Sequence, residues 1–190
     1  MADGDALVMK TEDLLVILDA IHRLYPGVKR VASYGTAQDI LRKSEEELIR
    51  LREAGLGIVY VGAESGDNEI LKYINKGVTA EQTIEAGQKL KRCGIATSVT
   101  LISGLGGRSK VEEHALSCAK AHHGDEPGVR ILLTLRLYEG TPMYADVVEG
   151  RFQRITPDEI VDEMEIFLKN VDSPGTVFRT NHASNYVILA

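Results

Sequence analysis

Short apolar runs alternate along this chain with longer stretches in which apolar residues recur at helical spacing. Residues 11–25 carry leucine or isoleucine at most third and fourth positions, which predicts an amphipathic helix with Thr11 as its N-cap. Four further helices are predicted where Ser or Thr is followed three residues later by Glu or Gln, beginning at Ser44, Thr79, Ser109 and Thr156. Five runs have the length and β-branched content of strands: residues 31–36, 58–63, 97–102, 129–138 and 176–180.

This alternation of strands and helices predicts βαβ crossovers and a parallel sheet. No linker or low-complexity segment divides the chain, so we expect residues 1–190 to form a single domain. Residues 2–9 look like the tail of a strand already under way, and no strand pattern closes the sheet after residue 180. We therefore expect an α/β fold: a partial (β/α) barrel with helices outside, truncated at the N-terminal end. A complete doubly wound sheet is the alternative left open.

Composition and charge narrow the class of protein. An apolar fraction of 44% and a charged fraction of 26% are ordinary for a globular domain. The net charge of −6 does not indicate nucleic-acid binding, although a local basic groove is compatible with it. No run has membrane-spanning length and no signal peptide opens the chain, which predicts a cytoplasmic protein. Cys93 and Cys118 are predicted to be small buried hydrophobes rather than metal ligands or a disulfide.

Polar residues gather where the predicted strands end. Ligands bind at the carboxyl ends of parallel strands, so these positions are the candidates for a site. They include Asp3, Asp5, Tyr34, Thr36, Glu64, Ser65, Ser103, Gly104, Arg136, Tyr138, Arg179, Asn181, His182, Ser184 and Asn185.

Glu64 is the strongest of these candidates. It stands in Gly-x-Glu-Ser-Gly, residues 62–66, directly after an apolar strand and before a short helix expected from Asp67. The glycines on both sides allow backbone and ligand to approach closely. A carboxylate here can accept hydrogen bonds from ribose hydroxyls or an ammonium group. The alternative is a glutamate that caps a helix or is solvated in a turn.

Other signals are less specific. Residues 103–107 form a glycine-rich turn before a helix, which suits either a phosphate cradle or a plain strand-to-helix connection. Arg136, inside a predicted strand, needs an acceptor in substrate, cofactor or a nearby acid such as Glu64. Residues 179–185 contact substrate if they cover the barrel mouth, and do nothing if they are a frayed terminus. Three histidines are interpreted as surface residues: His114, His122 and His123.

The strand and turn at residues 59–66, followed by Lys76-Gly77, resemble the fourth barrel strand of radical S-adenosylmethionine enzymes. In that family the Glu-Ser-Gly segment faces the nucleoside. Residues 100–104 resemble the fifth-strand G-x-I-x-G motif, whose backbone packs on adenine, with Thr100 in place of the first glycine. Residues 139–142 resemble the family's P-G-T-P turn. The likeness covers most of the chain and is nearest to the subgroup of the Elongator catalytic subunit, oxygen-independent coproporphyrinogen oxidase and methylthiotransferases.

The resemblance implies a parent enzyme that reductively cleaves S-adenosylmethionine at a [4Fe–4S] cluster to start radical chemistry on an unknown substrate. It implies cofactor contacts at Glu64, Ser65, Ser103, Gly104 and Arg136. The substrate contacts expected at the barrel mouth are Tyr34, Thr36, Arg179, Asn181 and His182. The family's C-x-x-x-C-x-x-C segment is missing. We therefore expect this chain alone to be inactive and to bind neither cluster nor cofactor tightly.

Two other functions are compatible with the residues. One is a small α/β binding module that holds a phosphate or nucleotide at the glycine-rich turn without catalysis. The other is a non-catalytic interaction fragment whose open sheet edge pairs with a partner or a second copy. The substrate, a small molecule or a macromolecule, is not specified by the sequence.

Overall fold

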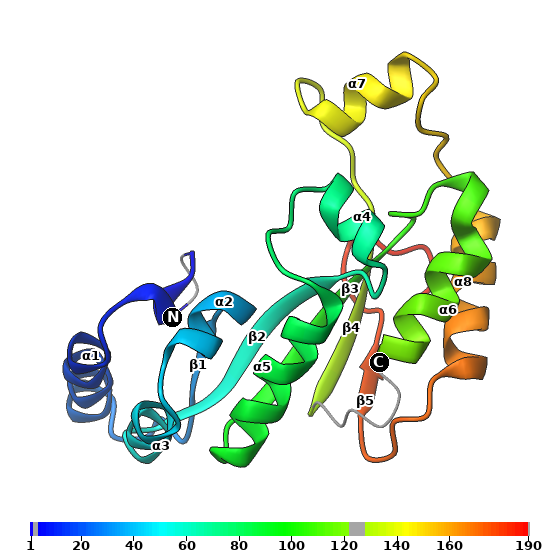
Figure 1. Cartoon of the computed structure of the whole chain (residues 1–190). Coiled ribbons are helices and arrows are strands. Elements are labelled where there is room, and N and C mark those ends of the chain that lie inside the picture. Colours follow the sequence, from blue (N-terminus) through cyan, green and yellow to red (C-terminus); the bar gives the residue numbers. More distant parts are fainter. Residues whose placement is uncertain (2–3, 122–127, 190) are drawn as a thin grey trace.

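The chain folds into one open sheet of five parallel strands (Figure 1). The computed structural model describes residues 1, 4–121 and 128–189. The strands are β1 Val31–Tyr34, β2 Leu56–Glu64, β3 Ala96–Ser103, β4 Val129–Thr134 and β5 Val177–Arg179. Their order in the sheet equals their order in the sequence, β1-β2-β3-β4-β5. In a doubly wound sheet the order of the strands reverses at a switch point, so the order in the sheet differs from the order in the sequence. The continuous order therefore confirms the partial barrel and excludes the doubly wound alternative.

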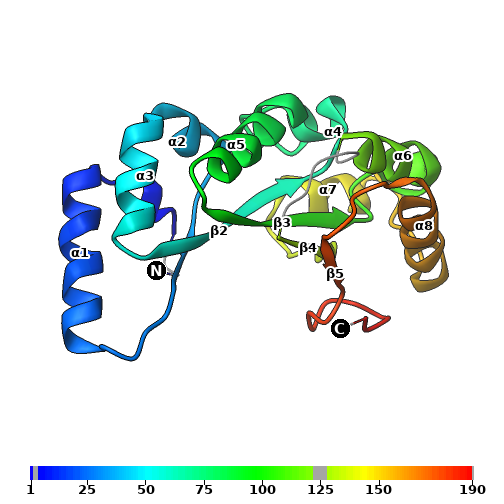
Figure 2. The same ribbon diagram turned by 90° about the horizontal axis from the view of Figure 1, so that it is seen from below.

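Helices connect the strands and lie outside the sheet, and Figure 2 shows α3, α5 and α6 along one of its faces. Their bounds are α1 Thr11–Leu24, α2 Ala37–Arg42, α3 Glu45–Glu53, α4 Asn68–Tyr73, α5 Ala80–Arg92, α6 Val111–Ala121, α7 Pro142–Val148 and α8 Pro157–Asn170. Two short 3-10 turns are η1 Ala6–Val8 and η2 Arg108–Lys110. None of the described helices is long and apolar enough to cross a membrane.

The predicted capping boxes begin three of these helices. Both reciprocal hydrogen bonds are present at Ser44, Thr79 and Thr156, which start α3, α5 and α8. The prediction at Ser109 was wrong in detail, because η2 comes first and α6 begins at Val111. Thr11 is the first helical residue of α1 rather than its N-cap, and its hydroxyl donates to Glu47 Oε1 at 2.6 Å. That contact joins α1 to α3.

The core lies between the sheet and the helices. Alternate residues of β2, such as Val59 and Val61, pack toward α3 and α5. A second apolar cluster lies beneath α6 and α8 and includes Val99, Leu101 and Phe167. Because side chains alternate across a strand, the intervening residues point to the other face of the sheet. We call this face, turned away from the helices, the inner face.

Two sequence predictions about strand limits need correction. β4 ends at Thr134 rather than residue 138, so Arg136 lies beyond the strand and is exposed. Near the N-terminus, residues 6–8 form η1 rather than strand. Met1 nevertheless lies along β1: its amino group donates to Ala32 O at 2.6 Å, and Tyr34 N donates to Met1 O at 3.3 Å. Self-association through the β1 edge stays a prediction. Ala2 and Asp3 lie outside the described residues.

Candidate functional site

A hollow of about 700 Å³ lies on the inner face near the carboxyl ends of the strands. Strand residues on this face line it: Tyr34, Tyr60, Gly62, Glu64, Thr100, Ile102, Ile131 and Leu133. Loop residues complete it: Gly4, Asp5, Gly35, Thr36, Lys76 and His182. The volume is typical of a small-molecule site. Its apolar floor and few polar groups at one end suit a ligand with both a flat ring and hydrogen-bonding hydroxyls.

Glu64 occupies an unusual backbone conformation at the end of β2. Its φ is +65°, the left-handed region that side-chain-bearing residues rarely adopt. The register with β3 shifts here, from Gly62 opposite Thr100 to Glu64 opposite Leu101. Glu64 nevertheless keeps the alternation of β2, so its side chain enters the hollow on the same face as Tyr60 and Gly62. Such conformations cost roughly 1–3 kcal/mol and cluster at functional sites, which favours a functional role for Glu64.

The Glu64 carboxylate is held by Lys76. Lys76 Nζ lies 2.8 Å from Glu64 Oε1, and the two side chains are 25% and 18% exposed. The helix that follows is capped by Asp67, whose Oδ1 accepts from the backbone N–H of Glu69 at 2.8 Å. The alternative in which Glu64 caps a helix is therefore excluded. The Lys-Gly pair noted in the sequence supplies the counterion of the candidate carboxylate.

The two glycines beside Glu64 have different roles. A Cβ on Gly62 would meet Glu64 Oε1 and would lie 3.1 Å from Lys76 Nζ, so the ion pair lies directly over this glycine. A Cβ on Gly66 would meet the carbonyl oxygen of Ser117 and would lie 2.7 Å from Cys118 Cα, both in the backbone of α6. One glycine makes room for the ion pair, and the other brings the end of the strand against a helix.

Ser65, Ser103 and Gly104, three predicted cofactor contacts, are bonded within the protein. Ser65 is 1% exposed, and its hydroxyl accepts from Asp67 N at 3.0 Å. Ser103 faces the helices, where its hydroxyl donates to Glu163 Oε2. Gly104 N donates to the same oxygen at 2.8 Å. Contact between these residues and a cofactor stays a prediction, but their polar groups already have partners within the protein.

The glycine-rich turn is explained by packing. A Cβ on Gly106 would lie 2.9 Å from both Lys110 O and His114 Cβ, and Gly104 adopts a φ of +91°. The anion that meets Gly104 N is the chain's own Glu163 carboxylate. The phosphate-cradle alternative is therefore not favoured, and the plain strand-to-helix connection describes this turn.

Arg136 does not reach Glu64. Its Nη2 donates to the carbonyl oxygen of Ala183 at 3.2 Å, so the alternative in which Arg136 pairs with Glu64 is not the one observed. Contact between Arg136 and a ligand stays a prediction. Thr36 lines the hollow, but its hydroxyl accepts from Asp39 N at 3.2 Å as the N-cap of α2. Tyr34 lies beside Tyr60 across β1 and β2, with ring centroids 5.4 Å apart.

The segment after β5 folds back onto the sheet rather than fraying. Asn185 Nδ2 donates to Leu132 O at 2.7 Å, and its Oδ1 accepts from Thr134 Oγ1 at 2.9 Å. His182 reaches the hollow, and its Nδ1 accepts from Ser184 N at 3.1 Å. In the neutral ring this assignment leaves the proton on Nε2. Arg179 and Asn181 are exposed and do not line the hollow, so their substrate contacts stay predictions.

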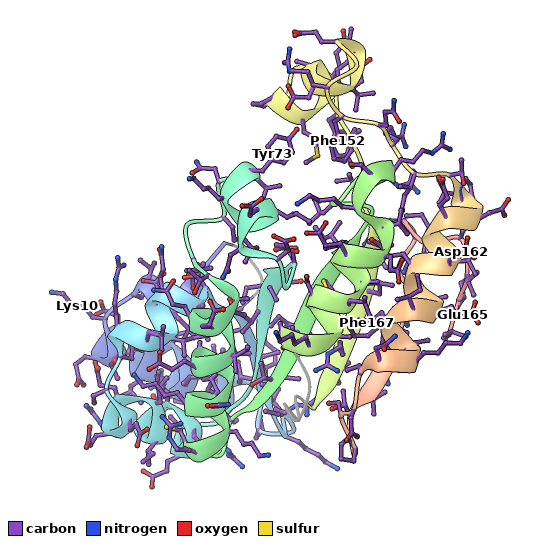
Figure 3. The ribbon with its side chains drawn as sticks, turned by 45° about the vertical axis from the view of Figure 1, so that its right-hand side comes forward. Lys10, Tyr73, Phe152, Asp162, Glu165 and Phe167 are labelled. Carbon is purple, nitrogen blue, oxygen red and sulfur yellow. The ribbon has the colours of Figure 1, made fainter. Side chains whose placement is uncertain are left out.

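The connection between β4 and α8 projects beyond the carboxyl ends of the strands and carries α7 (Figure 1). Thr141 caps α7 with Pro142 at its first turn, and Gly140 adopts a φ of +86°. Figure 3 shows Tyr73 and Phe152 facing one another, and their ring centroids lie 6.3 Å apart. Burial and a hydrogen bond to Asp146 raise the pKa of Tyr73 to about 12. These contacts join the projecting connection to α4.

Sequence reasoning missed a buried polar chain on the helix side of the sheet. His114, interpreted as a surface residue, is 2% exposed. Its Nδ1 lies 2.7 Å from Glu163 Oε1, and its Nε2 lies 3.4 Å from Cys118 Sγ. Burial lowers the pKa of His114, but its hydrogen bonds to Cys118 and Glu163 outweigh that effect and raise it to about 10. His122 and His123 lie outside the described residues.

The helical spacing of these polar residues relative to apolar ones was the sequence signal for their burial. Glu163 lies on the buried face of α8, together with Ile160, Met164 and Phe167. His114 and Cys118 are one turn apart on the buried stripe of α6. A carboxylate and an imidazole on two apolar stripes need each other as partners. The burial predicted for Cys93 and Cys118 is confirmed.

The cysteines do not fit a three-thiolate iron–sulfur site. Cys93 ends α5 and Cys118 lies on α6, each buried among apolar side chains. Within residues 1, 4–121 and 128–189, no group of three or more His, Cys, Asp or Glu side chains is placed to hold a metal ion. The hollow, by contrast, has the volume and the donor–acceptor groups to fit the nucleoside part of S-adenosylmethionine.

Comparison with known proteins gives consistent matches. A family model described as the Radical SAM superfamily matches residues 3–119. The tRNA uridine(34) acetyltransferase of Methanocaldococcus infernus is 28% identical over 120 residues, which are 63% of this chain and 22% of that protein. Its counterpart from Methanocaldococcus jannaschii is 26% identical over 119 residues, again 22% of the relative. The chain thus spans about a fifth of the length of these relatives.

Solved structures agree on the fold. Methanocaldococcus infernus Elp3 with an N-terminal deletion superposes with a TM-score of 0.71 at 21% identity, covering 93% of this chain and 46% of that one. The Escherichia coli coproporphyrinogen III oxidase HemN superposes with a TM-score of 0.65 at 14% identity, covering 87% of this chain and 38% of that one. At these identities the likeness shows a shared architecture.

Proposed function

This chain belongs to the radical S-adenosylmethionine superfamily, and from that premise we propose that it forms the nucleoside-binding part of a radical S-adenosylmethionine enzyme. The observation that carries the proposal is the Glu64 carboxylate, presented by a strained bulge at the carboxyl end of β2 inside a ligand-sized hollow. Lys76 is paired with one oxygen of this carboxylate, and a ligand with hydrogen-bond donors would give the other oxygen a partner.

The geometry suggests a division of tasks. Among the described residues, Lys76 is the side chain bonded to the Glu64 carboxylate, and it occupies Oε1. Oε2 is therefore available to accept hydrogen bonds from ribose hydroxyls or the ammonium group of S-adenosylmethionine. Thr100 and Ile102 line the hollow on the adjacent strand and would pack against the adenine ring. His182 also lines the hollow and would offer its Nε2–H to the ligand.

Radical S-adenosylmethionine chemistry is the reductive cleavage of the cofactor at a [4Fe–4S] cluster, which starts a radical reaction on a substrate. The two thiols of this chain do not fit that cluster, so the proposal assigns its residues only binding, orientation and exclusion of water. The similarity to tRNA uridine(34) acetyltransferases makes a uridine of tRNA the first substrate to test.

Calorimetric titration of the purified chain with S-adenosylmethionine and with 5′-deoxyadenosine tests the proposal. We expect weak binding of both, and a loss of about tenfold or more with Glu64→Gln, because a charge-assisted hydrogen bond contributes roughly 1.5–3 kcal/mol. Glu53→Gln, on an exposed position of α3, is the matched control and should bind as the parent does.

Lys76→Met separates the two roles of the ion pair. It leaves the Glu64 carboxylate charged but no longer oriented, so binding should weaken less than with Glu64→Gln. Unchanged affinity in Glu64→Gln would make Glu64 a turn residue. Absence of any binding by the parent chain at millimolar ligand would contradict the proposal for this chain.

A further inference from the structure

Three buried side chains form a continuous chain behind the hollow, on the helix side of the sheet. We call Glu163, His114 and Cys118 the buried triad. Glu163 Oε1 meets His114 Nδ1 at 2.7 Å, and His114 Nε2 meets Cys118 Sγ at 3.4 Å. All three residues are at most 4% exposed. Residues of two helices, α6 and α8, thus share one hydrogen-bonded unit that water does not reach.

The buried triad accepts hydrogen bonds from backbone N–H groups that directly follow two strands. Cys118 Sγ accepts from Gly66 N at 3.2 Å, two residues after Glu64. Glu163 Oε2 accepts from Gly104 N at 2.8 Å, two residues after Ile102, and from the hydroxyl of Ser103. The ends of β2 and β3 are therefore tied to one another through the helices. Glu64 and Ile102, on these same two strands, line the hollow on the inner face.

The hydrogen-bonding atoms of the Glu163 and His114 side chains all have partners. Both carboxylate oxygens of Glu163 have donors, and both ring nitrogens of His114 have partners. The raised pKa of His114 keeps it an imidazolium at neutral pH, so Nε2 donates to the sulfur. Satisfied buried ionic groups add little net stability compared with apolar packing, whereas they specify geometry strongly. The neighbouring buried positions of α8 are apolar, as in Ile160, Met164 and Phe167, so an apolar residue would also suit position 163.

The surroundings exclude a role in which the triad contacts an external molecule. Figure 3 shows Phe167 on the side of α8 next to α6, with Asp162 and Glu165 on its outer side. Together with the triad, Met164, Phe167, Leu101 and Leu132 line a cavity of about 10 Å³, which is too small for a substrate. The sulfur is therefore neither a nucleophile for an external molecule nor a surface thiol. Its contact with Gly66 is the connection that leads toward the hollow.

We propose that Glu163, His114 and Cys118 are positioning residues that hold the ends of β2 and β3 in register, so that Glu64 and Ile102 meet one nucleoside together. The role rests on the proposed function of the hollow. It extends that function by assigning residues that never touch the ligand. Gly66 strengthens the connection, because its close contact with the backbone of α6 passes any shift of that helix to the strand end.

Variants of the full chain separate positioning from simple stability. Cys118→Ala removes the acceptor of Gly66 N, and Cys118→Ser restores a shorter one. Glu163→Gln keeps the shape but cannot accept from His114 and Gly104 at once. Leu18→Ala is the control for stability, because Leu18 of α1 is fully buried in the other apolar cluster, away from the triad. Affinity for S-adenosylmethionine and 5′-deoxyadenosine is measured beside unfolding by urea.

We expect Cys118→Ala and Glu163→Gln to weaken binding roughly fivefold or more, an effect within the range for residues that couple to a site without touching it. Cys118→Ser should recover part of the loss. Leu18→Ala should lower stability and leave affinity unchanged. If Cys118→Ala and Glu163→Gln lose only stability, as Leu18→Ala does, the triad is structural and the proposal is wrong.

Amide NMR of the ligand-free chain keeps this inference separate from the proposed function. The Cys118 and Glu163 variants should shift the amide signals of Glu64 and Gly66, whereas Leu18→Ala should leave them in place. If the parent binds neither ligand, the proposed function fails and these shifts alone decide whether the triad positions the strand ends. Unmoved signals in both variants would overturn the positioning role.

Discussion

Replacing Gly66 by alanine tests how firmly the end of β2 is held against α6. The added Cβ would meet the carbonyl oxygen of Ser117 and would lie 2.7 Å from Cys118 Cα, where ordinary contact begins at 3.4 Å. Both neighbours belong to the backbone of a helix and cannot rotate away. Strand end and helix must therefore separate by at least 0.7 Å.

Overpacking of this kind costs about 1–3 kcal/mol, and the separation also weakens the hydrogen bond from Gly66 N to Cys118 Sγ. We expect the free energy of unfolding to fall by about 2–4 kcal/mol. For a chain of this size each kcal/mol lowers Tm by roughly 2–4 °C, so Tm should fall by about 4–16 °C. Urea unfolding followed by circular dichroism, with calorimetry for Tm, measures both quantities.

Gly87→Ala is the matched control. Gly87 lies within α5, and a Cβ there has no neighbour within 4 Å. Alanine in a helix interior stabilises by roughly 0.5–1 kcal/mol relative to glycine. The two substitutions are chemically identical and should have opposite signs. If Gly66→Ala destabilises by less than about 0.5 kcal/mol, the contact with α6 does not fix the strand end.

Gly62→Ala should change the free energy of unfolding by less than about 1 kcal/mol, because the added Cβ meets the movable carboxylate of Glu64. The same variant should weaken nucleoside binding in a titration, and unchanged binding would contradict the placement of that carboxylate. The pKa of His114 is about 10 when folded against 6.5 in its ordinary state, so its contribution to stability is complete below pH 6.5 and lost as the pH rises toward 10. Unfolding curves between pH 6 and pH 10 should show this loss, and His114→Gln should flatten it. Asn185→Ala removes two hydrogen bonds to main-chain carbonyls and should lower the free energy of unfolding by about 1–3 kcal/mol. Hydrogen exchange at the amides of β4 should accelerate, and protection equal to the parent's would refute the role of Asn185 in holding the C-terminal segment against β4.

Local patterns in the sequence were sufficient for the architecture. Apolar periodicity and the boxes at Ser44, Thr79 and Thr156 start three helices where the structure has them. These signals depend on residues within one or two turns of each other, so no long-range contact is needed to recognise them. The residues around Glu64 also stood out, because a carboxylate between glycines at a strand end is a local pattern. Its place in the hollow followed from the parallel order of the strands.

Tertiary structure decided which polar groups face the same way. Glu64 and Ser103 both end strands, yet Glu64 shares the inner face with Tyr60 and Gly62 while Ser103 faces α8. Both faces of these strands carry apolar residues, so the alternation in the sequence did not show which face the helices cover. The pairing of His114 with Glu163 joins positions 49 residues apart. It exists only because α6 and α8 pack side by side, since two buried polar groups become partners through packing rather than through spacing along the chain.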